Sequence, residues 1–134
     1  MTARVLVIDD DEIAGEAVRQ ILEAEGHTAW VLPSPIGATQ AIIKEKVSVV
    51  VLDVHMPSIS GDKLAQLLRR NPRLDHLGIV LISGIQSTEL SNLANDVGAD
   101  AVVVKRELHQ ELAQAVSLAY RLAQTRRPSS HLGA

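Results

Sequence analysis

The sequence predicts an α/β domain in which five parallel strands form one open, doubly wound sheet covered by five helices. Short, continuous apolar runs rich in β-branched residues recur along the chain, which is typical of strands buried on both faces of a parallel sheet. Between these runs, apolar residues follow the spacing of amphipathic helices. Strict alternation of strands and helices implies right-handed crossovers, and these place helices on both faces of the sheet.

Each expected element can be placed on the chain. The expected strands are residues 5–8, 28–32, 49–52, 79–82 and 101–104, of which 28–32 is the weakest. Helical spacing occurs within residues 13–22, 38–42, 64–68, 90–97 and 108–122, and the last helix is expected to run from about 107 to 124. Residues that end helices or form turns stand between these segments: Gly26, Pro33, Pro35, Pro72 and Gly98.

Length and composition restrict the organisation of the chain. Its 134 residues are the usual size of one domain. We expect that domain to occupy residues 1–124, followed by a polar tail or linker over 125–134. The absence of cysteine excludes thiol catalysis, cysteine-based zinc sites and iron–sulfur clusters.

Charge and aromatic content argue against direct nucleic-acid or membrane binding. Thirteen Lys and Arg residues against sixteen Asp and Glu give a net charge of −3, and aromatic residues make up 1% of the chain. No apolar run approaches the length of a membrane span, and the first residues lack the apolar stretch of a signal peptide. We therefore expect a cytoplasmic protein that recognises its partners through local parts of its surface rather than through its overall charge.

Charged and polar residues stand where four of the expected strands end. The first strand is followed by residues 9–12, the third by Asp53, the fourth by Ser83 and the fifth by Lys105. If these strands are neighbours, their carboxyl ends meet at one edge of the sheet, which is where ligands bind in such folds. A cluster of carboxylates there persists only if a cation or protonation relieves the repulsion, and Mg²⁺ prefers such oxygen ligands.

The same groups suit phosphoryl chemistry. An ammonium group at Lys105, a hydroxyl at Ser83 and Mg²⁺ together balance the charge of a phosphoryl group on a carboxylate. Asp53 is the nucleophile in this interpretation, as in aspartyl-phosphate chemistry.

These residues together resemble the receiver domain of two-component response regulators, which has a flavodoxin-like (βα)₅ fold. The matching segments are residues 8–10, 52–57 with Gly61, 82–84, and 98–100 leading to Lys105. The intervals from Asp10 to Asp53, from Asp53 to Ser83 and from Asp53 to Lys105 all fit the family. The resemblance covers about residues 4–124.

The resemblance implies a role for each site residue. Asp53 resembles the phosphoacceptor, Asp10 a direct Mg²⁺ ligand, and Asp9 a carboxylate that acts through bound water. The backbone carbonyl of His55 resembles a further Mg²⁺ ligand, Ser83 the hydroxyl that moves toward the phosphoryl group, and Lys105 its ion-pair partner.

The resemblance also implies a signalling switch and its partners. Such a domain is not an enzyme beyond promoting its own phosphoryl transfer and dephosphorylation. A sensor histidine kinase or histidine phosphotransfer protein would donate to Asp53, and an unidentified protein effector would read the change. A homodimer through the fourth helix, fifth strand and fifth helix is a further expectation.

Three residues depart from the family pattern. Arg106 stands where the family usually has a proline, so we predict a trans Lys105–Arg106 peptide and an altered loop. Val102 replaces the aromatic residue of the usual switch, so signalling through that face must use backbone and loop movement. The His55 side chain, two residues after Asp53, is expected at the solvent-facing rim of the pocket.

Simpler interpretations exist for single residues. Residues 9–12 also fit a charge run that caps the first helix, with Asp10 or Asp11 as N-cap, and the ligand pair could be Asp10 and Asp11. Basic residues at the end of the last helix, from Arg121 to Arg126 and beyond, fit simple compensation of the helix dipole. We assign no chemistry to His27 or His76, which lack metal-ligand spacing.

Three other functions compete with the phosphoacceptor. An unphosphorylated interaction or dimerisation module is favoured by Val102 and Arg106 but not by the complete acidic pocket. A haloacid-dehalogenase-type phosphatase would need an aspartate at position 55, where His55 stands. Flavin binding would need a phosphate loop after the first strand, and the sequence has none there.

Overall fold

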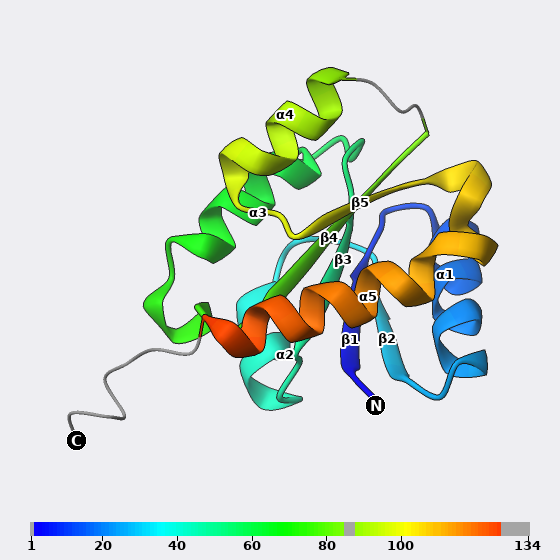
Figure 1. Ribbon diagram of the computed structural model, residues 1–134, viewed down its shortest axis with the longest axis horizontal. Helices are drawn as coiled ribbons and strands as arrows, with labels where there is room; N and C mark the ends of the chain where they lie inside the picture. Colours follow the sequence, from blue (N-terminus) through cyan, green and yellow to red (C-terminus); the bar gives the residue numbers. More distant parts are fainter. Residues whose placement is uncertain (1, 85–87, 127–134) are drawn as a thin grey trace.

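The computed structural model describes residues 2–84 and 88–126, without the side chain of residue 89. Five parallel strands form one sheet in the order β2-β1-β3-β4-β5 (Figure 1). The strands are β1 (Arg4–Ile8), β2 (Thr28–Leu32), β3 (Val49–Asp53), β4 (Gly78–Ser83) and β5 (Ala101–Val104). The helices are α1 (Glu12–Ala24), α2 (Ala38–Lys44), α3 (Gly61–Arg69), α4 (Thr88–Val97) and α5 (Leu108–Thr125), with short 3₁₀ turns η1 (Pro72–Leu74) and η2 (Lys105–Glu107).

The predicted fold class is confirmed, and alternating strand residues explain its two cores. Leu6 and Val50 face α2, α3 and α4 on one side of the sheet. Their neighbours Val5 and Val51 face α1 and α5 on the other side. Because both faces are covered, the strands read as continuous apolar runs rather than alternating ones.

β1 and β4 each begin one residue earlier than predicted, and β3 and β4 each end one residue later. Asp53 is the last residue of β3 and Ser83 the last residue of β4, so both side chains sit on sheet backbone rather than on loops. This matters for the site because strand backbone, which is paired with a neighbouring strand at both residues, moves less than a connecting loop.

The ends of the helices follow local rules. Asp11 is the N-cap of α1, and its carboxylate accepts hydrogen bonds from the backbone N–H groups of Ile13 and Ala14. No peptide bond in the described part of the chain is cis, so the predicted trans Lys105–Arg106 bond is confirmed. The chain passes directly from β5 through η2 into α5.

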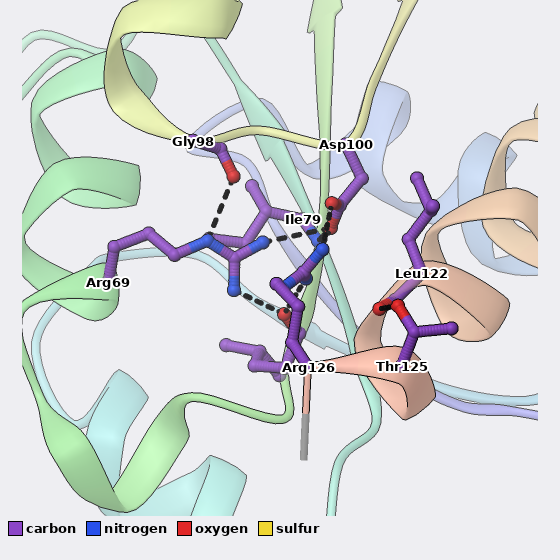
Figure 2. Close-up of polar contacts among 8 residues, drawn as sticks. Arg69, Ile79, Gly98, Asp100, Leu122, Thr125 and Arg126 are labelled. Carbon is purple, nitrogen blue, oxygen red and sulfur yellow. Dashed lines mark hydrogen bonds and ion pairs between the residues drawn. The ribbon is translucent and has the colours of Figure 1, made fainter. Parts of the chain in front are cut away.

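Arg69, Asp100 and Arg126 form an ion cluster that joins distant segments of the chain (Figure 2). The cluster lies at the amino edge of the sheet, because Asp100 directly precedes β5. Asp100, whose side chain is 5% exposed, accepts from Arg69 at 2.8 Å, from Arg126 at 2.7 Å and from the Ile79 backbone N–H at 2.9 Å. Both arginines also donate to the Leu77 carbonyl. Dipole compensation is therefore an incomplete account of Arg126, because this residue has a specific partner that lies 26 residues earlier in the chain.

The predicted tail is only partly described. α5 ends at Thr125, one residue beyond the predicted end, and residues 127–134 lie outside the described residues. Among the described helices, none combines the length and apolar character needed to cross a membrane.

Candidate functional site

Strand register brings the predicted site residues to the carboxyl edge of the sheet. Ile8 of β1 is paired with Leu52 of β3, so the residues that follow them, Asp9 and Asp53, lie side by side. Asp53 is paired with Ile82, which places the next residue of β4, Ser83, beside it. Val104 is paired with Ser83, and Lys105 follows it directly.

Three carboxylates form an acidic cluster at this edge. Asp9, Asp10 and Asp53 each offer an oxygen, and these oxygens lie within 4.8 Å of one another. Asp9 and Asp53 are each only 4% exposed, whereas Asp10 is exposed. Hard carboxylate oxygens with one solvent-facing member suit Mg²⁺, which is usually bound by one or two carboxylates and keeps several waters.

Asp53 is held at both oxygens. Its Oδ2 lies 3.2 Å from the Nζ of Lys105, and its Oδ1 accepts a hydrogen bond from the His55 backbone N–H at 3.0 Å. The Lys105 side chain is 38% exposed, so the ammonium group reaches the buried carboxylate from the solvent side. This arrangement fixes the orientation of the carboxylate before any ligand binds.

The charge of Asp9 is disfavoured where it stands. Burial raises the pKa of Asp9 from its ordinary value of 3.8 to about 6, and the negative charges of Asp53 and Asp10 act in the same direction. The Asp11 backbone N–H, which donates to Asp9 at 2.9 Å, and the charge of Lys105 lower the pKa but do not cancel the rise. The cluster thus carries unfavourable charge that a bound cation would relieve.

Three further residues singled out in the sequence are Ser83, His55 and Val102. Ser83 is buried at the end of β4, and the His55 side chain is exposed, as expected for a residue at the rim. Val102 of β5 is partly buried and packs against the core beneath α2, α3 and α4. The resemblance to receiver domains implies an aromatic switch residue at this position, and the short branched side chain of Val102 has no ring that could take that role.

Gly61 has a role that sequence reasoning missed. A Cβ at this position would lie 2.3 Å from the carbonyl oxygen of Asp53, which no side chain can tolerate. The Gly61 N–H also donates to the Val54 carbonyl at 3.0 Å. Glycine therefore lets the first turn of α3 rest directly on the backbone of the site, a contact that only the folded arrangement reveals.

Comparison with known proteins finds one family over most of the chain. The family model for the response regulator receiver domain matches residues 5–117. A gliding motility regulatory protein of Myxococcus xanthus is 32% identical over 114 residues, which are 84% of this chain and 15% of that protein. Response regulator MprA of Mycobacterium ulcerans is 30% identical over 112 residues, 84% of this chain and 47% of that protein. The chain thus spans less than half the length of these curated relatives.

Solved structures share the same fold. The receiver domain of Francisella response regulator 1452 has a TM-score of 0.78 at 26% identity and covers 90% of this chain and 98% of its own. NtrX from Brucella abortus, solved in complex with ADP, has a TM-score of 0.84 at 26% identity, over 98% of this chain and 30% of its own. A response regulator receiver domain protein from Clostridium thermocellum, 22% identical, has a TM-score of 0.79 over 92% of this chain and 98% of its own.

Proposed function

This chain belongs to the response regulator receiver domain family of two-component signalling, and we propose that Asp53 is its phosphoacceptor. Phosphorylation on an aspartate is the standard role of this family, whose members are signalling switches rather than classical enzymes. The observation that supports Asp53 is its position: it is a buried carboxylate at the end of β3, fixed by Lys105 and beside two further carboxylates.

Asp9, Asp10 and Asp53, with the backbone carbonyl of His55, would hold Mg²⁺. The residues present fit the ion because Asp9 and Asp53 are buried close together and the charge on Asp9 is disfavoured without a cation. When bound, the ion supplies charge neutralisation and orientation for phosphoryl transfer.

An oxygen of Asp53 attacks the phosphorus of a phosphohistidine donor. A P–O bond to Asp53 forms, the P–N bond breaks, and the donor imidazole leaves with the electron pair. Lys105, already 3.2 Å from Oδ2, stabilises the added negative charge, and the Ser83 hydroxyl donates to the phosphoryl group. Hydrolysis of the acyl phosphate, with water attacking phosphorus, returns Asp53 and inorganic phosphate.

The proposed phosphodonor is a sensor histidine kinase or a histidine phosphotransfer protein. In this proposal the chain is phosphorylated in the cytoplasm. The output is a change in protein contacts at the face of α4, β5 and α5, either with an effector or with a second copy of the chain. Because Val102 has no ring to move, backbone movement around Ser83 and Lys105 carries the change in this proposal.

Intact-mass analysis tests the proposal. After incubation with Mg²⁺ and acetyl phosphate, we expect one added phosphoryl group, absent from the Asp53→Asn variant and from protein in EDTA. Beryllofluoride binding that requires Mg²⁺ should accompany it. If neither the adduct nor beryllofluoride binding is observed, the phosphoacceptor role is refuted and an unphosphorylated interaction module becomes the better description.

A further inference from the structure

A second hollow lies at the opposite edge of the sheet from the acidic cluster, and we call it the basal cavity. It has a volume of about 400 Å³ and lies where the end of α2 and the chain into β3 meet η1 and α5. Ser48, which lines it, immediately precedes the first residue of β3, so the cavity opens at the amino edge of the strands. The lining residues used below are Ile43, Lys46, Arg73, His76 and Tyr120.

Part of the basal cavity's lining is apolar. Ile42, Val47 and Leu74 lie in the core behind it and are only 1–2% exposed, so the apolar side chain of α2 that a ligand can reach is Ile43, which is 37% exposed. Tyr120 of α5 adds an aromatic ring to the lining. A hollow of this volume, lined by both apolar and polar groups, can hold a small organic ligand that carries both kinds of group.

Half of the polar side chains that line the cavity belong to lysine, arginine or histidine. Lys46, Arg73 and His76 contribute to the lining, and none of the described residues that line it is an aspartate or a glutamate. Within the described part of the chain, neither Lys46 nor Arg73 has a carboxylate partner within ion-pair distance. In a chain of net charge −3, the exposed Lys46 and Arg73 therefore offer two positive charges to the cavity that no described carboxylate contacts.

Lys46 occupies a backbone position that favours glycine. Its φ is +53°, directly after α2, where the next N–H, that of Val47, returns to the Ile42 carbonyl at 2.9 Å. α1 and α4 end in the same way but with glycines at positive φ, Gly26 and Gly98. Helix termination alone therefore does not explain a lysine at position 46, because glycine would form this turn with less backbone strain.

We propose that the basal cavity binds a small organic anion, with its negative group at Lys46 and Arg73 and its apolar body against Ile43 and Tyr120. The lysine then explains both the unneutralised charge and the choice of a non-glycine residue at the left-handed turn. The cavity lies at the opposite edge from Asp53, so this inference does not depend on phosphorylation.

Backbone amide shifts in ¹H–¹⁵N NMR titrations test this site with benzoate as the probe. Benzamide has the same shape without the charge, and sulfate has charge without the apolar body. We expect benzoate to shift the amides of residues 46–48 and 73–77 saturably and to bind at least several-fold more tightly than either comparison compound. Loss of one charge-assisted contact in Lys46→Asn should weaken benzoate binding about tenfold.

Two further variants separate binding from folding. Lys46→Gly should weaken benzoate binding to a similar extent while melting at least as high as the parent, because glycine suits the left-handed turn. Lys44→Gln removes the same charge from an exposed residue of α2 that does not line the cavity, and should bind benzoate like the parent. Absence of saturable shifts, equal binding of benzamide or sulfate, or equal weakening by Lys44→Gln would each overturn the proposal.

Discussion

Replacing Asp9 by asparagine should stabilise the metal-free fold at neutral pH. Burial and two neighbouring carboxylates raise the pKa of Asp9 to about 6, so its ionised form opposes folding. Asp9 accepts a hydrogen bond from the Asp11 backbone N–H at 2.9 Å. Asparagine has the same shape and an oxygen that can accept this hydrogen bond, but it carries no charge. The variant therefore removes the repulsion while retaining the local backbone contact.

The magnitude follows from linkage between protonation and folding. The unfolded chain loses the Asp9 proton near pH 3.8, whereas the folded chain keeps it until about pH 6. The favourable protonated contribution is thus complete below pH 3.8 and is lost as the pH rises through 6. Above that pH the loss amounts to about 3 kcal/mol, or roughly 10 °C in melting temperature for a domain of this size.

Urea unfolding in EDTA from pH 4 to pH 8 measures this difference directly. Asp9→Asn and the parent should have similar free energies of unfolding near pH 4, and the variant should become more stable as the pH rises. Asp96→Asn, the same charge change at an exposed site on α4, should show no such divergence. Adding Mg²⁺ at pH 7.5 should stabilise the parent more than Asp9→Asn. A constant difference across the pH range, or a variant less stable at pH 8, would refute the reasoning.

Three other variants probe contacts described above. Gly61→Ala places a methyl group against the carbonyl of Asp53, the proposed phosphoacceptor, so the rate of phosphorylation by acetyl phosphate should fall about tenfold or more, while a parent-like rate would show that this close approach is unimportant. Arg126→Gln should lower the free energy of unfolding by about 1 kcal/mol. Arg69→Gln should lower it by more, because the Arg69 guanidinium is more buried against Asp100 than that of Arg126. The reverse order in urea unfolding would contradict this ranking. Burial lowers the pKa of His27, so the parent should lose stability as the pH falls below 6.5 relative to His27→Asn, and parallel pH profiles would disprove this.

The acidic cluster could be predicted because its residues obey a topological rule. Asp9, Asp53 and Lys105 each stand at the end of an apolar run, and parallel strands bring such ends to one edge. The prediction also required that these strands be neighbours, and the order β2-β1-β3-β4-β5 meets that condition. The trans peptide before Arg106 followed from the chemistry of non-proline peptide bonds.

Other features depend on packing between segments far apart in the chain. No local pattern in the sequence marks Arg69 and Arg126 as partners of Asp100. An arginine near the end of a helix is ordinarily interpreted as a solvent-exposed charge that compensates the helix dipole. The close approach of Gly61 to the backbone of β3 and the lysine at the basal cavity likewise depend on where helices settle on the sheet. Sequence periodicity predicts which face of a helix is buried, but not the atom it meets.

The end of α5 bears on how the domain can be cut from a longer protein or joined to another. The family match stops at residue 117, yet Ala119 and Ala123 are fully buried, and a Cβ on Gly78 would lie 2.7 Å from the Ala119 carbonyl. Nine residues beyond the match, Arg126 closes the ion cluster around Asp100. The minimal cooperative folding unit is thus longer than the family-sized segment. Chimeras should be joined after Arg126, because a junction at residue 117 would uncover β4 and leave one guanidinium fewer on a buried carboxylate.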